Sequence, residues 1–322
     1  MARVLSPLAA FDIAEDGRAS PVAEDWPVAA PRAGARWRWL HLDVTNPAMA
    51  GWAAEHLPEV AAAALSQPET RPRCDALGAG LILNLRGVNM NPGQESDDMV
   101  SLRMWVGEAL IVSARVRKVF AVDALRQAAL AGHAPPTPDA FLLRLTEGLT
   151  DRIEAVSLAL EDATDTLEEE IFDHDRFDAD ALAPTRRKVI RLRRYIGPQR
   201  EALNRLAQSP LPLIGPEIRP MLAETANRAT RAVEELDAVS ARLAALQEHV
   251  NAELAARMGR NGYVLSVVAA IFLPLGFFTG LFGVNLAGIP GTAAPDAFTI
   301  LTVTLSALGL GLFALFRWRK WL

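Results

Sequence analysis

The residues best placed to do chemistry lie at the end of a long apolar run, in the stretch 279–286 that reads TGLFGVNL. Asn285 follows this run directly, and its side-chain amide offers one carbonyl acceptor and two N–H donors. Such a group is costly near the end of a membrane helix unless something uses it. One interpretation is a helix C-cap, since Asn is tolerated there. The other is a group that interacts with something outside its own helix.

Small residues recur on the same run at heptad spacing, at Gly262, Ala269, Gly276 and Gly283. A close helix–helix contact is one interpretation, because residues 276 and 280 form a small-xxx-small pair. A pore wall is the other, because a narrow bore needs small side chains and exposed carbonyls. Pro274 frees the carbonyl of residue 270 for either purpose. The predicted pore-lining set is Gly262, Ser266, Ala269, Leu273, Gly276 and Gly280.

Two apolar segments are long enough to position these residues in a membrane. Residues 263–282 and 298–316 contain 20 and 19 residues without a charge, and a spanning helix needs roughly 20. A buried core helix is the alternative for either. Basic residues flank the pair on one side, as Arg257, Arg260 and the terminal RWRKWL. Because basic flanks stay cytoplasmic, we predict cytoplasmic termini and a short external loop. Two spans cannot enclose a pore, so a pore requires an oligomer.

Composition agrees with a membrane protein. The chain has 322 residues, of which 51% are hydrophobic and 22% charged, and its net charge of −5 argues against a nucleic-acid partner. Cys74 is the only cysteine, which excludes an intrachain disulfide and suits a reducing compartment. The acidic N-terminal stretch is not a signal peptide. The chain has no GxGxxG, P-loop or HExxH motif and no recognisable nucleophile–base set, so we predict that it is not an enzyme.

A long helix leads into the first apolar segment. Residues 221–258 contain neither glycine nor proline, and apolar residues recur at three- and four-residue steps from Leu222 to Leu254. We predict one helix over 217–282, which must pack against partners along most of its length. Two helices precede it, at 139–172 and 183–207, with a kink or break at Gly197-Pro198. The acidic end of the first and the basic start of the second predict charge pairing between them or an electrostatic device near an ion path.

The N-terminal part reads as an α/β domain. Segments 36–44, 80–90, 99–106 and 109–116 are rich in Val, Ile, Leu and Trp and predict strands, with a tight hairpin at Gly107-Glu108. Helices are predicted at about 47–66 and 118–131.

Taken together, these features resemble the CorA-type divalent-cation transporter superfamily, whose signature is Gly-Met-Asn. Gly283-Val284-Asn285 within AAIFLPLGFFTGLFGVNLAGIPG resembles its ZntB-like zinc branch, as do RPRCDALGAGLILNLRGVNMNPG and DDMVSLRMWV near the N-terminus. The resemblance covers essentially the whole chain. It implies a funnel-shaped homopentamer in which the first span lines the pore and a ring of Asn285 amides forms the outer mouth. Such a neutral ring accepts hydrogen bonds from the water shell of an entering cation.

The resemblance also orders the chain into segments. The predicted fold class is an α+β membrane protein in the bacterial inner membrane. Its predicted segments are a cytoplasmic α/β domain (1–135), a helical hairpin (136–216), a stalk helix (217–262), a first transmembrane helix (263–282), an external loop with the Gly-Val-Asn motif (283–297), a second transmembrane helix (298–316) and a basic cytoplasmic tail (317–322).

Ordinary metal ligands are scattered. No two of the five histidines share a helical turn, and each is best explained as a surface or core residue. His249, beside Glu248 on the long helix, is the best exception, because five copies could converge. Asp173, His174 and Asp175 at the hairpin tip are a weaker candidate.

We therefore predict transport of divalent cations, with zinc as the ion and uptake assisted by a proton gradient, and no bound cofactor. The magnesium branch carries an acidic residue soon after its motif, whereas the loop here has only Asp296. Zinc efflux, or a channel for magnesium, cobalt or nickel, is the alternative within the superfamily. A membrane-anchored oligomeric sensor or scaffold is a more distant alternative. The predicted partners are other copies of the chain, divalent cations and membrane lipid.

Overall fold

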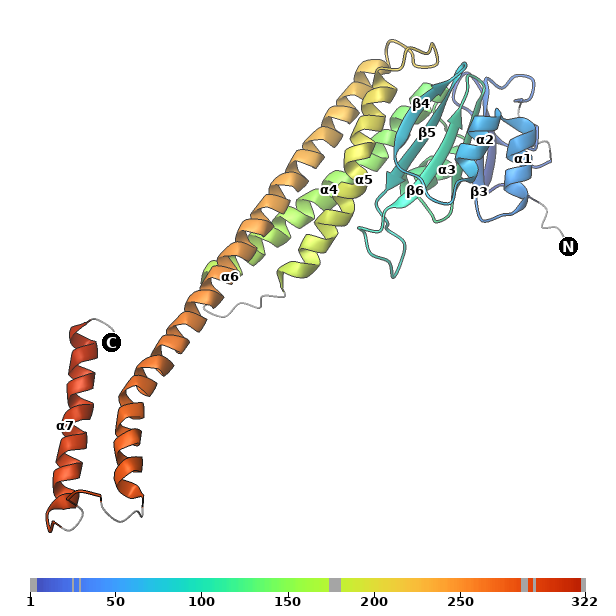
Figure 1. Ribbon diagram of the computed structural model, residues 1–322. Helices are drawn as coiled ribbons and strands as arrows, with labels where there is room; N and C mark the ends of the chain where they lie inside the picture. Colours follow the sequence, from blue (N-terminus) through green and yellow to red (C-terminus); the bar gives the residue numbers. More distant parts are fainter. Residues whose placement is uncertain are drawn as a thin grey trace. The chain divides into compact units, whose positions relative to one another are not determined.

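Figure 1 shows the computed structural model of the protein. The chain forms two compact units, Met1–Leu246 and Gln247–Leu322. Asn285, His174 and Asp175 lie outside the described residues, and only the backbone of Asp173 is described. The described residues are 5–24, 26–28, 30–173, 181–284, 289–291 and 294–319.

The first unit contains a seven-stranded sheet in the order β2-β1-β3-β7-β6-β5-β4. β3 and β7 are parallel, and every other neighbouring pair is antiparallel. The strands are β1 (Ala9–Ile13), β2 (Ala19–Pro21), β3 (Trp37–Asp43), β4 (Arg73–Leu77), β5 (Gly80–Gly87), β6 (Val100–Val106) and β7 (Leu110–Arg115).

The four predicted strands are confirmed as β3, β5, β6 and β7. The hairpin between β6 and β7 is confirmed as well, because the Gly107 N–H donates to the Leu110 carbonyl at 2.8 Å. The strands β1, β2 and β4 were not predicted. β2 has only three residues, and the sequence of β4, RCDAL, contains no β-branched or aromatic residue. These three strands form because a neighbouring strand offers a complete hydrogen-bonding edge.

Helices cover both faces of the sheet. α1 (Ala48–His56) and α2 (Glu59–Ser66) bury Trp52 and Leu65 with the residues of one face. α3 (Phe120–Leu130) and the start of α4 (Pro138–Asp173) cover the other face, where Trp39 packs on Phe141 with ring centroids 4.9 Å apart. The predicted helical stretch 47–66 is two helices, because Leu57 precedes a proline and adopts an extended conformation.

α5 (Leu182–Ala207) and α6 (Arg219–Gly283) complete the long helices. Their ends lie within two residues of the predictions. A kink or a break was predicted at Gly197-Pro198, and the break is wrong, because α5 continues through Pro198. Apolar residues on both sides of the proline are buried, including Ile196 and Leu203. This packing keeps the residues before and after Pro198 in one helix. The proline costs the helix a single backbone hydrogen bond, because it has no backbone N–H.

The predicted charge pairing between α4 and α5 is wrong for the residues that the structure describes. The described ion pairs of the α4 acidic residues with another helix run to α6: Arg228 binds Asp151 at 2.7 Å, and Arg242 binds Asp165 at 2.6 Å. Basic residues of α5 pair elsewhere, as Arg193 does with Asp237 of α6 at 2.6 Å. The acidic face of α4 thus pairs with α6, whereas the basic residues of α5 pair with α6 and with the loop between β5 and β6, where Arg191 binds Asp97 at 3.2 Å.

The second unit contains the end of α6 and α7 (Ala297–Trp318). Among the described helices, these two are long and apolar enough to cross a membrane. Almost none of either apolar segment is buried within the chain.

Candidate ion pathway

The predicted pore residues lie on one continuous helix. α6 runs without interruption from Arg219 to Gly283 and includes Pro274. Residues spaced by three, four and seven positions share one side of an α-helix. We call this side the small-residue face; its members are Gly262, Ser266, Ala269, Leu273, Gly276, Gly280 and Gly283.

The small-residue face is open. Each of its seven residues is exposed, and the Leu273 side chain is 74% exposed. A Cβ added at Gly262, Gly276, Gly280 or Gly283 would have no other atom within 4 Å. Within the described residues, no part of the chain packs against this face.

α7 lies against a different side of α6. A Cβ added at Gly309 of α7 would meet the Leu275 side chain at 3.4 Å. Val267 is buried, and Ile271 and Leu275 are half-buried, so these three mark the covered side. At about 100° per residue, the covered side lies roughly 170° from the centre of the small-residue face. The glycines therefore do not serve the contact between the two helices of this chain.

Two hydroxyl groups on this part of α6 donate to their own helix. Ser266 Oγ donates to the Gly262 carbonyl at 2.8 Å, and Thr279 Oγ1 donates to the Gly276 carbonyl at 3.1 Å. Their hydrogens are thus used, while the oxygens keep lone pairs that can accept a hydrogen bond. On the small-residue face, Ser266 offers an acceptor and no free donor, which suits the water shell of a cation.

The Gly-Val-Asn motif lies where α6 ends. Gly283 is the last helical residue, and Val284 is exposed. Because Asn285 lies outside the described residues, its role at the mouth stays a prediction.

The candidate metal ligands do not gather into a described site. Glu248 and His249 are exposed on α6. Within the described residues, no three His, Cys, Asp or Glu side chains are arranged to hold a metal ion. A metal at residues 248 and 249 would therefore need groups from another copy of the chain.

The stalk part of α6 is held by its own chain. Arg228 Nε donates to Glu154 at 2.9 Å while its Nη2 binds Asp151, and Arg242 binds both Asp165 and Glu168 through its Nη2. The two clusters are 14 residues apart on both helices. The sequence carries this signal as DRIE at 151–154 and DTLE at 165–168, although these ion pairs were not predicted from it.

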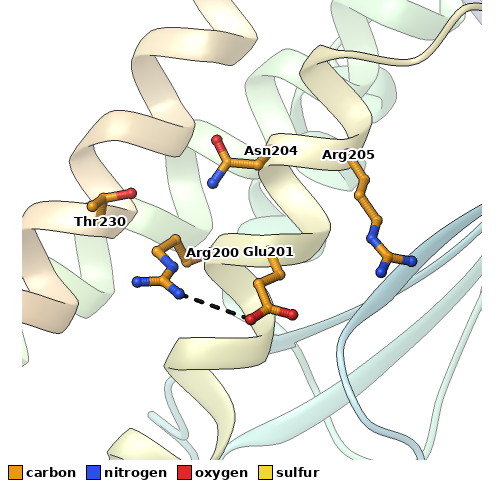
Figure 2. A pocket seen from close by; sticks show the side chains of 5 residues that line it. All are labelled: Arg200, Glu201, Asn204, Arg205 and Thr230. Atoms are coloured by element: carbon orange, nitrogen blue, oxygen red, sulfur yellow. Dashed lines mark ion pairs between the residues drawn. The ribbon is translucent and has the colours of Figure 1, made fainter.

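A surface hollow of about 490 Å³ lies beside α5 and α6 (Figure 2). Arg200, Glu201, Asn204 and Arg205 line it from α5, and Thr230 lines it from α6. Arg200 lies 3.8 Å from Glu201, and Arg205 lies 3.6 Å from Asp75 of β4. Since both arginines already have a carboxylate nearby, the hollow offers no strong unmet charge.

The chain combines an α/β unit, a long helix, a Gly-Val-Asn motif and a second apolar helix, in that order. This combination defines a class of membrane transporters. Residues 34–318 match the model of the CorA-like Mg²⁺ transporter protein family, and the chain belongs to that family.

Two named proteins and two solved structures are similar to this chain. The chain is 36% identical over 286 residues to "Zinc transport protein ZntB" of Yersinia enterocolitica, with 88% of each chain covered. It is 36% identical over 289 residues to "Divalent cation transporter CmaX" of Pseudomonas aeruginosa, covering 88% of this chain and 87% of that one. The solved structure of full-length CmaX matches with a TM-score of 0.84 at 33% identity over 98% of both chains. The CorA magnesium transporter of Methanocaldococcus jannaschii shares the fold, with a TM-score of 0.78 at 14% identity.

Proposed function

We propose that this chain carries divalent cations across a membrane along the small-residue face of α6, zinc in preference to magnesium. One observation carries the proposal: this face is exposed and points away from α7. Glycines on the lipid side of a simple anchor would have no purpose, whereas around a shared axis they leave room for an ion with its water. The names of the relatives, a zinc transport protein and a divalent cation transporter, agree with this chemistry.

The working form is a homopentamer. Two apolar helices cannot enclose a bore, so several copies of α6 must surround one axis. The number five rests on the resemblance to the family. In that ring the mouth would be formed by Gly283, Val284 and Asn285, and Glu248 and His249 of five copies would converge on the stalk. Asp173, His174 and Asp175 form a second, peripheral metal candidate.

The preference for zinc rests on two features. The motif has Val284 where the magnesium branch has methionine, and Asp296 is the one acidic residue between the two apolar segments. A nearly neutral mouth attracts a strongly hydrated magnesium ion less than an acidic one would. Cobalt and nickel are further candidate cargoes.

Transport is inward and assisted by protons in this proposal. A membrane potential negative inside favours uptake by roughly 2.3 kcal/mol per charge per 100 mV, and by about twice that for a divalent ion. Proton assistance rests on the resemblance to the zinc branch. Residues 263–282 contain no Asp, Glu or His, so a proton relay would use groups outside the first span.

The proposed location is the bacterial inner membrane, with both termini in the cytoplasm. Arg257 and Arg260 precede the first span, and Arg317 and Arg319 end the second. The predicted boundary between stalk and first span, at residues 262 and 263, belongs to this proposal. A reporter fused after Leu322 should be active in the cytoplasm, and activity only in the periplasm would contradict the topology.

The test of the function is cation flux into liposomes that contain the purified protein and an internal metal dye. Zinc, magnesium, cobalt and nickel are compared under matched gradients, with and without a pH difference at clamped membrane potential. We expect zinc flux to exceed magnesium flux and to rise with an inward proton gradient. Flux no greater than in protein-free vesicles would support an anchor or scaffold instead. Faster magnesium flux would refute the selectivity.

A further inference from the structure

A cavity in the first unit lies at the carboxyl ends of the two parallel strands. β3 and β7 are neighbours and run in the same direction, with Asp43 beside Arg115 at their ends. After β3 the chain passes to α1 on one face of the sheet, and after β7 it passes to α3 on the other. Open α/β sheets bind ligands in the crevice that such a divergence creates.

The cavity found there has a volume of about 280 Å³. Its charged lining comes from the end of β7, from α3 and from the connection between them, and its apolar lining includes Leu8, Val119 and Val122. The charged residues are Arg115, Lys118, Asp123 and Arg126. Three cations and one carboxylate leave an excess of two positive charges.

Asp123 is already engaged by two of the cations. Lys118 Nζ lies 2.9 Å from its Oδ2, and Arg126 Nη2 lies 3.0 Å from its Oδ1. Burial acts to raise the pKa of Asp123, but the hydrogen bonds from Lys118 and Arg126 outweigh it, and the pKa is lowered. The carboxylate is thus ionised and forms ion pairs with these two cations. It acts on Arg115 only through space, as the Asp43 carboxylate also does.

Arg115 is held by a buried, neutral histidine. Its Nε donates to His41 Nε2 at 3.1 Å, which leaves Nδ1–H to donate to Ser113 Oγ at 2.8 Å. Burial and the neighbouring Arg115 lower the pKa of His41, which is 2% exposed, to about 3. The histidine therefore orients the guanidinium without neutralising it.

The outer fork of Arg115 remains available. Within the described parts of the chain, its two terminal nitrogens have no hydrogen-bond partner, and no carboxylate oxygen lies within 4 Å of them. The nearby Asp43 carboxylate accepts instead from the backbone N–H and the hydroxyl of Thr45. The first turn of α3 begins at the same cavity, and its N-cap, Val119, supplies no capping side chain.

We propose that this cavity binds a small phosphomonoester. Arg115 lines the cavity, and the N–H groups of its two terminal nitrogens form a fork whose geometry matches the oxygens of a phosphate group. The excess of positive charge in the lining favours an anion such as a phosphate group. The apolar wall of Leu8, Val119 and Val122 leaves room for the organic part of the ester, which inorganic phosphate would not use.

The test is calorimetric titration of the full-length protein in detergent, with a chelator present so that the result does not depend on the transported ion. The probes are inorganic phosphate, glycerol 3-phosphate and adenosine monophosphate. We expect saturable binding of at least one ester, tighter than that of inorganic phosphate. Arg115→Gln should weaken it about tenfold or more, because a charge-assisted bidentate contact is lost.

Arg117→Gln is the matched control, because Arg117 binds Asp98 at 2.6 Å and does not line the cavity. The affinity of the Arg117→Gln variant for the ester should stay within about twofold of that of the wild type. If circular dichroism shows that Arg115→Gln does not fold, Lys118→Glu takes its place as the test variant. We expect Lys118→Glu to weaken binding of the ester as well. The proposal is overturned if no ester binds at millimolar concentration, if the folded variants at 115 or 118 bind as the wild type does, or if inorganic phosphate binds as tightly as the esters.

Discussion

The two halves of α6 contrast in where their partners are. From Arg219 to Leu246 the helix buries an apolar stripe, including Leu236 and Leu243, within its own chain. Arg228 and Arg242 add ion pairs to α4 on the same half. From Tyr263 to Gly283 the helix is more apolar, yet it leaves nearly all of its surface uncovered.

This contrast teaches where each half obtains its stability. The first half has its packing partners within one chain, so changes there should alter the stability of the first unit. The second half needs lipid on one side and, in our proposal, other copies of itself on the small-residue face. Changes on that face should alter flux and leave the fold intact. The following substitutions test this separation of effects.

Gly276→Leu should have the largest effect. Five leucines on a shared axis would fill a narrow bore, so zinc flux should fall about tenfold or more while assembly is kept. The matched control is Gly311→Leu on α7, where an added Cβ also meets no atom within 4 Å. Equal flux in the two variants, with equal oligomer size by native mass spectrometry, would make the small-residue face a packing seam.

Asn285→Ala should reduce zinc flux about three- to tenfold, because the mouth loses a ring of amide acceptors for the hydrated ion. The oligomer should still form, since the stripe of the stalk is untouched. Flux assays with zinc and magnesium measure the effect. If only the melting temperature changes and flux per oligomer does not, the amide serves as a helix cap.

His41→Gln should change how stability depends on pH in the first unit. The folded-state pKa of His41 is lowered from 6.5 to about 3, so the unfolded chain binds the extra proton between these values. The contribution of His41 to the free energy of unfolding is fully present above pH 6.5 and is lost as pH falls toward 3. The slope is at most about 1.4 kcal/mol per pH unit. The variant should lose this slope in urea unfolding between pH 4 and 7, whereas His56→Gln should keep it.

Arg228→Gln should have the smallest effect. Its ion pairs with Asp151 and Glu154 are partly exposed, so the loss is about 1 kcal/mol, or a fall of about 2–4 °C in the apparent Tm. Arg231→Gln is the control, because Arg231 pairs with an exposed Glu224 on its own helix. Flux per oligomer should not change. A loss of flux in the folded Arg228 variant would contradict the separation of the two halves.

The long helices and the two apolar segments were predictable because each is an unbroken pattern within one stretch of sequence. The strands β5, β6 and β7 were predictable for the same reason. β2 and β4 were not, because a short strand takes its conformation from its neighbours. The break at Pro198 was predicted wrongly because α5 is held together by the burial of residues on both sides of the proline. That burial depends on other elements of the fold and cannot be read from the local sequence.

The candidate sites divide in the same way. The small-residue face follows from spacing on one helix, and the structure adds that α7 lies on the opposite side. The contact of Arg228 with α4 was missed, since it joins residues 74 positions apart, although the 14-residue recurrence was visible. The cavity beside His41 depends on the parallel pairing of β3 with β7, which no short stretch of sequence reveals. Whether residues 262–285 line a pore stays a prediction.

Thiol modification at position 276 tests the central claim most directly. Cys74 is buried, and burial raises its pKa to about 12, so it should react poorly and can be replaced by alanine for a clean background. In liposomes, a charged methanethiosulfonate should label Gly276→Cys and stop zinc flux. Gly311→Cys, which is exposed on α7 and which we expect to face lipid, should stay unlabelled and active. If Gly276→Cys is labelled to completion and zinc flux persists, or if neither position reacts while flux continues, the small-residue face does not line the ion path.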